Sequence, residues 1–220
     1  MDNKRIQKEH YEKYDYELEY DWSSDKRIKI LLKIMHNSKG KLLDIGCNCG
    51  KTCELFRNKG YDVSGIDISR TAVAKSRAKG FDIRLGDVTK ELPYLNNSFD
   101  AIFIGEVLEH ILNPKFLLTE SYRILKKKGF LYITVPNISS LRNIFLIIFG
   151  RLPAYSCGYN SIHVRDFCKR DLHNLLSSIG FHSIIFKGDC LAIPINRNLS
   201  INLSPFYPRL SDYLIIRCKK

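Results

Sequence analysis

The sequence predicts an α/β fold, with a seven-stranded and mostly parallel sheet, an antiparallel last strand and helices on both faces. Short apolar runs typical of strands alternate with amphipathic runs typical of helices from residue 41 onward. The run at 99–107 is apolar at nearly every position, as expected of a strand that is buried on both faces. A chain of 220 residues is long enough to form one domain around its own core.

The predicted elements follow one another in a regular order. Helical spacing of apolar residues covers the first two dozen residues and continues over 25–35. Glycines at 60, 80 and 180 predict where three of the later helices end. The predicted strands are 41–46, 61–69, 81–88, 99–107, a strand after a turn within 126–137, 181–188 and 213–220, and the predicted helices among them are 51–60, 70–80, 113–125 and 169–180.

The chain is basic, with a formal net charge of +12. Residues 138–220 hold eleven Lys and Arg against four Asp and no Glu, so most of the surplus lies in this last part. Such a surplus fits an acidic partner such as RNA, a phosphorylated metabolite or an anionic membrane, and it fits an ordinary solvated surface equally well. Nothing in the pattern indicates DNA.

The N-terminal residues and the cysteines bear on the cellular compartment. The first two dozen residues are polar and charged, without the apolar segment of a secretory signal or membrane anchor, so we expect a cytoplasmic protein. Seven cysteines are an odd number, and those at 47, 49 and 53 lie close together without a paired C-x-x-C element. In a reducing compartment we expect them to be small buried residues rather than disulfide partners or metal ligands.

A glycine-rich turn, DIGCNCG at 44–50, lies between the first predicted strand and the helix that follows it. Open α/β sheets bind ligands at this position, against backbone N–H groups and a helix N-terminus. A dinucleotide fingerprint would need glycine where the chain has Asn48 and Lys51, and the Gly-Lys-Ser/Thr of a phosphate-binding P-loop is missing. The turn therefore argues against a hydride-transfer enzyme and against a P-loop enzyme.

Five motifs stand in order and at ordinary spacing: DIGCNCG at 44–50, GIDIS at 65–69, GDV at 86–88, FDAIFIGEVLEHI at 99–111 and LKKKGFLYITVPN at 125–137. Together they resemble the class I S-adenosylmethionine-dependent methyltransferases, and the chain is similar to the ubiquinone-pathway O-methyltransferases among them. The resemblance covers almost the whole chain. It implies a Rossmann-like fold, S-adenosylmethionine as cofactor, and methyl transfer to an oxygen or nitrogen of a small-molecule acceptor, with oxygen preferred. Asn48 replaces the family's usual glycine, but asparagine tolerates the left-handed backbone region, so we expect the turn to be kept.

The resemblance also implies which residues hold the cofactor. Asp67, at the end of the second strand, is expected to accept both ribose hydroxyls, and Asp87, at the end of the third, to accept the adenine amine. Ile68 and Val88 are expected to pack on the adenine ring, and Asp44 to fix the loop or meet the ammonium group. The whole expected set, with Gly105 beside the methyl group, is Asp44, Gly46, Cys47, Asn48, Gly50, Asp67, Ile68, Asp87, Val88 and Gly105.

Two carboxylates and an imidazole, Glu106, Glu109 and His110, directly follow the fourth predicted strand. If a helical turn begins at residue 106, the three side chains share one face. Similar Glu-x-x-Glu-His elements occur in small-RNA 3'-terminal 2'-O-methyltransferases and in ubiquinone-pathway catechol O-methyltransferases. In the RNA enzymes the element binds a divalent ion together with a later histidine, here His163. The resemblance thus implies a metal site of Glu106, Glu109, His110 and His163, whose mixed ligands suit Mn, Fe or Zn better than Mg. The alternative, which we favour, is a metal-free site. Glu109 and His110 then cap the helix, line the pocket or bind neighbouring backbone, and His110 or His163 is the candidate catalytic base.

Residues 138–168 fall after the fifth strand, where the resembling enzymes insert substrate-binding lids. The apolar run IFLIIFG lies between Arg142 and Arg151. This run could bind an apolar acceptor, contact a membrane surface, or form a lid helix that packs on the core. We favour the last interpretation. Tyr155, Tyr159 and Arg165 are candidates for the pocket wall.

The expected organisation is one methyltransferase domain, with a helical cap at 1–37, a cofactor-binding core at 38–137, a lid or substrate segment at 138–168 and a C-terminal helix with strands at 169–220. Two further functions stay open: a metal-dependent RNA 2'-O-methyltransferase, and a non-catalytic subunit that binds the cofactor for a partner. The sequence identifies neither the methyl acceptor nor the oligomeric state.

Overall fold

The computed structural model describes residues 25–36, 40–154, 156, 162–190 and 207–220. The predicted first helix, within residues 1–24, lies outside the described residues, as do Tyr155 and Tyr159.

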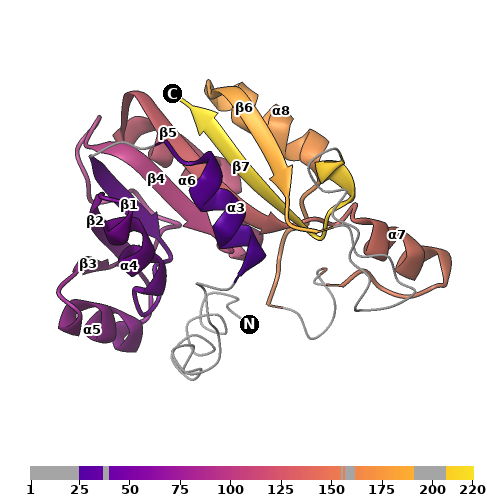
Figure 1. Ribbon diagram of the computed structural model, residues 1–220, viewed down its shortest axis with the longest axis horizontal. Coiled ribbons are helices and arrows are strands. Elements are labelled where there is room, and N and C mark those ends of the chain that lie inside the picture. The colour runs from indigo at the N-terminus through magenta and orange to yellow at the C-terminus, as the bar shows by residue number, and fades with distance from the viewer. Residues whose placement is uncertain (1–24, 37–39, 155, 157–161, 191–206) are drawn as a thin grey trace.

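Seven strands form a single sheet (Figure 1). They are β1 (Lys41–Ile45), β2 (Asp62–Asp67), β3 (Asp82–Leu85), β4 (Phe99–Gly105), β5 (Leu125–Pro136), β6 (His182–Gly188) and β7 (Tyr213–Lys219). Their order in the sheet is β3-β2-β1-β4-β5-β7-β6. The first five strands pair in parallel, whereas β7 lies antiparallel between β5 and β6. The predicted sheet, mostly parallel with an antiparallel last strand, is confirmed.

Helices cover both faces of the sheet. They are α3 (Lys26–Ile34), α4 (Lys51–Asn58), α5 (Arg70–Ala78), α6 (Pro114–Ile124), α7 (Leu141–Ile148) and α8 (Lys169–Ile179), with the short 3-10 turns η1 (Leu108–His110) and η2 (Pro208–Leu210). Apolar side chains of α3, α4 and α5 pack on one face. Those of α6 and α8 pack on the other. In Figure 1, α3 crosses the near face of the sheet and α8 lies behind β6.

The helix ends follow the local sequence. The Ser69 side chain accepts a hydrogen bond from the Ala72 backbone N–H and begins α5. The Asn113 side chain does the same for Phe116 at the start of α6, where Pro114 takes the first helical position. The three glycines predicted to end helices, at 60, 80 and 180, all have positive φ, at 99°, 80° and 114°.

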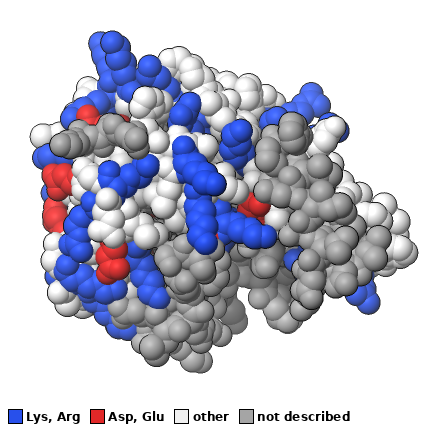
Figure 2. Space-filling view, viewed as in Figure 1, with Lys and Arg blue, Asp and Glu red and all other residues white. Residues whose placement is uncertain are grey.

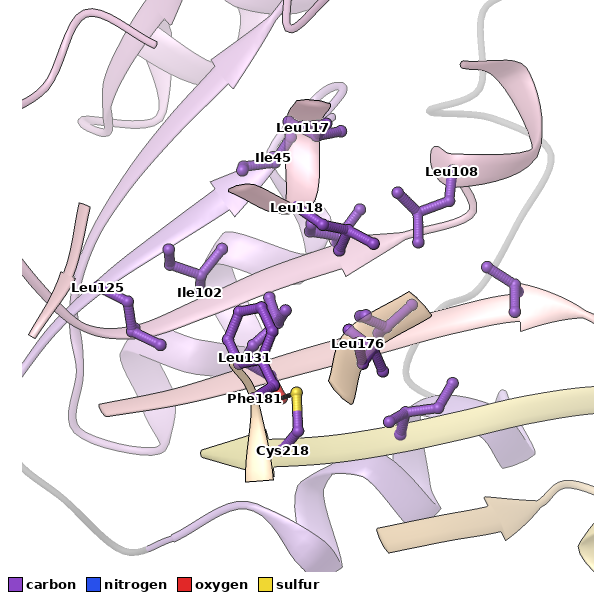
Figure 3. Close-up of a cluster of buried hydrophobic side chains, with 14 of the residues drawn as sticks. Ile45, Ile102, Leu108, Leu117, Leu118, Leu125, Leu131, Leu176, Phe181 and Cys218 are labelled. Carbon is purple, nitrogen blue, oxygen red and sulfur yellow. Dashed lines mark hydrogen bonds between the residues drawn. The ribbon is translucent and has the colours of Figure 1, made fainter. Parts of the chain in front are cut away.

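Successive side chains of the central strands point to opposite faces of the sheet and pack in two different cores. These strands are therefore apolar at nearly every position. In β1, Leu42 belongs to the core under α3 and α4, and Leu43 to the core under α6 and α8. Figure 3 shows the second core, where Leu117, Leu118 and Leu176 from the helices meet strand residues such as Ile102 and Leu131. Full burial of one such leucine contributes roughly 1.5–3 kcal/mol.

The segment after β5 departs from the expected packing. Residues of the apolar run form α7. The buried residue of this helix is Asn143, whereas the large apolar side chains of α7 are partly or largely exposed. The interpretation of α7 as a lid packed on the core is therefore wrong. Among the described residues, no helix is long and apolar enough to cross a membrane.

Candidate active site

A cavity of about 300 Å³ opens at the carboxyl ends of the parallel strands. The strand order reverses between β1 and β4, and loops that leave these two strands diverge to opposite sides, which opens a crevice there. Residues from the ends of β1, β2, β3 and β4 meet in the cavity wall, together with two residues from the segment after α7. The lining comprises Gly46, Cys47, Asn48, Cys49, Lys51, Thr52, Ile66, Asp67, Ile68, Ser69, Gly86, Asp87, Val88, Thr89, Phe103, Gly105, Glu106, Val107, His110, Ile111, Ile162 and His163.

The glycine-rich turn after β1 forms one wall. Gly46 has a φ of 77°, and an added Cβ there would collide with the Val107 side chain. Asn48 has a φ of 46°, so the predicted left-handed conformation at this position is confirmed. The Ser76 hydroxyl donates to the Asn48 carbonyl at 2.6 Å, which ties the turn to α5. The Cys47, Cys49 and Cys53 side chains are buried, as the sequence predicted.

Asp67 lies at the end of β2, where two backbone N–H groups orient its carboxylate. Its Oδ2 accepts from Asn48 N at 2.8 Å and its Oδ1 from Ser69 N at 2.9 Å. Burial raises the pKa of this carboxyl above its ordinary value, and the two backbone N–H donors oppose the rise. The side chain thus links the turn after β1 to the start of α5, and it borders the cavity.

The loop after β3 supplies the neighbouring wall. Asp87 accepts from the Thr89 backbone N–H at 2.9 Å and from the Thr89 hydroxyl at 2.6 Å. Ile68 and Val88 also border the cavity, beside the two acids. The structure therefore brings Asp67, Ile68, Asp87 and Val88 together in one wall, although the sequence places them in two different loops.

Asp44 does not border the cavity. Its buried side chain accepts from the Thr52 hydroxyl at 2.5 Å and from the Cys53 thiol at 3.5 Å, both on α4. Burial raises the pKa of Asp44 to about 7, and these two hydrogen bonds only partly oppose the rise. Of the two roles expected for Asp44, the observed contacts match the one that holds the loop against the helix.

Glu106 lies where β4 ends, and its surroundings differ from the predicted ones. The predicted helical turn does not begin at residue 106: Glu106 has a φ of 54°, and the 3-10 turn η1 starts only at Leu108. The expectation that Glu106, Glu109 and His110 share one helical face is therefore wrong. Arg27 of α3 instead pairs with Glu106, with its Nη1 3.0 Å from Oε2.

Arg27 is held from several sides. Its guanidinium bonds to the carboxylate of Asp25, which also caps α3, and it stacks over the Tyr213 ring at 4.2 Å from the centroid. Despite the pairing, burial raises the pKa of Glu106 to about 7, while Arg27 acts to lower it. Helix α3 thus places a guanidinium, paired with two carboxylates, beside the cavity.

Three residues of the Glu-x-x-Glu-His region and the later segment do come together. Glu109, His110 and His163 each offer a ligand atom, and these atoms lie within 4.8 Å of one another. Neither carboxylate oxygen of Glu109 has a hydrogen-bond partner in the described part of the chain, although the side chain is buried. Burial and the nearby Glu106 raise the pKa of Glu109 well above its ordinary value. The trio has the donor chemistry of a small divalent site, and Glu106 lies outside it.

Backbone hydrogen bonds bring His163 to this place. The Glu109 carbonyl accepts from Val164 N at 2.8 Å and from Arg165 N at 3.1 Å, so the segment after α7 is fastened to η1. His110 Nδ1 lies 3.3 Å from the Ile162 carbonyl, and the two imidazole centroids are 4.8 Å apart. His110 and His163 both border the cavity.

The other candidates of residues 138–168 lie elsewhere. The Arg165 side chain donates to the Leu112 carbonyl at 2.8 Å and is absent from the cavity lining. Arg142, on α7, and Arg151, just after it, are exposed. Tyr155 and Tyr159 lie outside the described residues.

Sequence reasoning missed several residues of the site. Thr52, Ser69, Phe103, Ile111 and Ile162 border the cavity without having been singled out. Ser69 carried a usable signal, since a serine between a strand and a helix is a typical N-cap. Arg27 carried none, because its partner Glu106 is remote in sequence and meets it only through the packing of α3.

Comparisons with known proteins agree with this architecture. A family model described as a methyltransferase domain matches residues 43–133. A ubiquinone biosynthesis O-methyltransferase of Pelagibacter ubique is 33% identical over 57% of this chain and 50% of that protein. A demethylmenaquinone methyltransferase of Renibacterium salmoninarum is 35% identical over 42% of this chain and 40% of that protein. The chain spans about half the length of the curated relatives that it matches.

Solved structures share the fold over most of the chain. A SAM-dependent methyltransferase from Thermotoga maritima superimposes with a TM-score of 0.70 at 18% identity, covering 89% of this chain and 88% of the other. The name of that protein gives S-adenosylmethionine (SAM) as the compound on which it depends. The matched methyltransferase domain, the relatives and the shared fold therefore make this chain similar to the S-adenosylmethionine-dependent methyltransferases.

Proposed function

We propose that this protein transfers a methyl group from S-adenosylmethionine to an oxygen or nitrogen atom of a small-molecule acceptor, with oxygen preferred. One observation carries the proposal. The cavity joins two acids at neighbouring strand ends, Asp67 and Asp87, to two imidazoles at its other wall, His110 and His163. Relatives named for ubiquinone biosynthesis and for demethylmenaquinone suggest a quinone-related acceptor as the first to test.

The residues present fit a nucleoside with an amino-acid tail. A volume of about 300 Å³ is within the range of small-molecule sites. Carboxylates at the ends of β2 and β3 are acceptors for hydroxyl and amine donors, and charged hydrogen bonds of this kind contribute roughly 1.5–3 kcal/mol each. We assign the ribose hydroxyls to Asp67 and the adenine amine to Asp87, with Ile68 and Val88 against the ring.

The glycine-rich turn is assigned to the tail of the cofactor. Gly46, Cys47, Asn48 and Gly50 let the backbone approach closely, and Asp44 holds this turn to α4 through Thr52. Gly105, the last residue of β4, also borders the cavity, and we assign it to the methyl end of the cofactor. When bound, the cofactor supplies a methyl group on a positively charged sulfur.

Two tasks remain for the acceptor end of the cavity. His110 or His163 accepts the proton of the acceptor hydroxyl or amine, because a neutral imidazole is a base near pH 7. The walls also align the acceptor with the methyl group, and such positioning alone lowers a barrier substantially. The Ile162 carbonyl, 3.3 Å from Nδ1, orients the His110 ring.

A divalent metal at Glu109, His110 and His163 is a second candidate for the same end. The supporting observation is the buried Glu109 carboxylate, which has no hydrogen-bond partner in the described residues and faces two imidazoles within 4.8 Å. A bound divalent ion would lower the pKa of a coordinated hydroxyl. Glu106 drops out of the set proposed from sequence, because it pairs with Arg27.

The cofactor site is tested by calorimetry of the full chain with S-adenosylhomocysteine. We expect saturable one-to-one binding, and no binding at millimolar ligand would end the proposal. Transfer is then tested with methyl-labelled cofactor and separate small-molecule and RNA fractions of a cell extract. Label in the small-molecule fraction supports the proposal. Label in RNA that ribonuclease removes would support the 2'-O-methyltransferase alternative, and binding without any transfer would support a non-catalytic subunit.

The metal candidate is tested by elemental analysis and by thermal unfolding with added Mn²⁺ or Zn²⁺. An ion at about 100 times its Kd would stabilise the fold by about 2.7 kcal/mol, and Glu109→Gln and His163→Ala should remove this shift. Chelator-treated protein with full activity and no metal-dependent shift would exclude the metal candidate and leave the imidazole base.

A further inference from the structure

The packing of α7 is the reverse of what its composition suggests. Its buried residue is a polar one, Asn143, whose Nδ2 donates to the Asn137 carbonyl at 3.0 Å and whose Oδ1 accepts from Ala154 N at 2.8 Å. The apolar side chains face outward instead. The exposed ones on the helix and just after it are Ile144, Phe145, Ile147, Ile148, Phe149 and Leu152, of which Ile148, Phe149 and Leu152 are 69%, 74% and 73% exposed.

Within the described part of the chain, this apolar surface lies at one end of the domain. Figure 1 shows α7 projecting from the end of the domain opposite to α5. Contiguous exposed apolar patches on soluble domains generally mark interaction surfaces, whereas scattered single residues do not. We call residues 141–152 the apolar arm. One hydrogen bond of Asn143 joins the arm to Asn137, directly after β5, and the other joins the start of the arm to Ala154, just after its end.

Positive charge prevails around the apolar arm, although one acid from the η2–β7 turn, Asp212, interacts with Ser140 and Arg142 at the start of α7. No Asp or Glu occurs between Glu120 and Asp166, while Arg142 and Arg151 lie at the two ends of the arm and are exposed. In Figure 2 no acidic residue among the described ones shows over the end where α7 projects. An apolar surface bordered by arginines is typical of segments that bind at a membrane surface.

A second cavity, of about 330 Å³, lies at the base of the arm. Its wall includes Ser139, which directly precedes the N-cap of α7, and three cationic side chains from α8 and η2. The nearest acid in sequence, Asp171, accepts from the Cys168 thiol at 3.2 Å. We call this the cationic cavity, and it is lined by Ser139, Cys168, Lys169, Arg170, His173, Asn174 and Arg209.

We propose that the apolar arm and the cationic cavity form one docking surface for an anionic phospholipid membrane. The arm inserts its isoleucine and phenylalanine side chains among the acyl chains near the interface, and the cavity takes up phosphate headgroups. Charge complementarity decides in favour of this partner. A second copy of the chain would bring two cationic cavities together, and an RNA would leave the apolar arm in water. At eight residues, α7 lies along the membrane surface rather than across it.

The test is flotation of the full chain with two sets of vesicles, one of phosphatidylcholine alone and one with phosphatidylglycerol added in equal amount. We expect binding to the anionic vesicles at least about tenfold stronger than to the neutral ones, and weakening with added salt. Ile148→Ser combined with Phe149→Ser should reduce binding by about tenfold or more, and Arg170→Glu combined with Arg209→Glu by a similar factor. Leu95→Ser, at a residue 82% exposed on the loop before β4, is the matched control and should leave binding unchanged.

The outcomes separate the partners. Absence of binding to the anionic vesicles, equal binding to both sets, or loss of binding in Leu95→Ser would each overturn the proposal. Light scattering that shows a dimer in the wild type and a monomer in the arm variant would assign the surface to a second copy instead. All variants should bind S-adenosylhomocysteine as the wild type does, which shows that they are folded. Phe149→Trp adds a direct readout, because brominated lipids should quench this tryptophan beyond the background from Trp22.

Discussion

Asp67→Asn is the sharpest perturbation of the proposed cofactor site, because it keeps the shape of the side chain and removes its charge. The carboxylate accepts from two backbone N–H groups, of Asn48 and Ser69, and is proposed to accept two ribose hydroxyls as well. An amide offers one oxygen and one NH2 group in place of two oxygens. The new NH2 group must then point at one of the groups that donate to Asp67, either a backbone N–H or a ribose hydroxyl.

The loss can be estimated from these contacts. A hydrogen bond to a charged acceptor contributes roughly 1.5–3 kcal/mol, and one to a neutral acceptor roughly 0.5–1.5 kcal/mol. If one hydrogen bond from a ribose hydroxyl is weakened and the other is lost, the binding free energy falls by about 3 kcal/mol. S-adenosylhomocysteine would then bind about 100-fold more weakly. The change also removes a buried charge, whose raised pKa reflects a desolvation cost. The unfolding free energy without ligand should therefore change by only about 1 kcal/mol.

Isothermal calorimetry on the full chain measures the Kd, and urea denaturation measures the unfolding free energy. Asp62→Asn is the matched control, since Asp62 is exposed at the opposite end of the same strand, β2. It should leave the Kd within about twofold of the wild-type value. If Asp67→Asn binds within about threefold of wild type, Asp67 does not face the ribose and the orientation proposed for the cofactor is refuted.

Three further predictions concern the surroundings of the site. Arg27→Met leaves the Glu106 carboxylate without its cation, and urea denaturation should show a loss of about 3 kcal/mol, because breaking one side of a buried ion pair typically costs about that much. Between about pH 4 and pH 7 the stability of the cofactor-free protein should fall as pH rises. Burial raises the folded-state pKa of Asp44 to about 7, so the folded state holds a proton that the unfolded chain releases near pH 4. Asn48→Val should destabilise by about 1–2 kcal/mol in the same assay, since a β-branched residue resists a φ of 46°.

Each of these has a matched comparison. Arg27→Met combined with Glu106→Gln should recover much of the lost stability, and no recovery would mean that the ion pair is not the cause. Asp44→Asn should reduce the change in unfolding free energy between about pH 4 and pH 7 by up to about 4 kcal/mol. An unchanged slope would mean that another group is responsible for the pH dependence. Asn48→Gly should be neutral within about 0.5 kcal/mol, and an equal loss in both variants would point to the Asn48 side chain instead of the backbone.

The sequence by itself determined the fold and the acidic side of the cavity. Alternation of strand and helix patterns was enough for the parallel sheet, because period-two and period-3.6 burial are local properties of the chain. The acids at 67 and 87 could be placed for a similar reason. Both directly follow parallel strands, and the carboxyl ends of such strands lie at one edge of the sheet.

Tertiary packing alone decided which residues meet at the histidine side of the cavity and which face α7 exposes. The pairing of Arg27 with Glu106 and the meeting of His163 with Glu109 and His110 join segments that are distant in sequence, and no local periodicity records such contacts. The backbone of Glu106, at a φ of 54°, delayed the helical turn and moved this side chain away from the trio. The outward face of α7 was also beyond sequence reasoning. An apolar run indicates only that burial of its side chains would be favourable. Whether they are buried by the core, by a substrate or by another surface depends on where the fold places the helix.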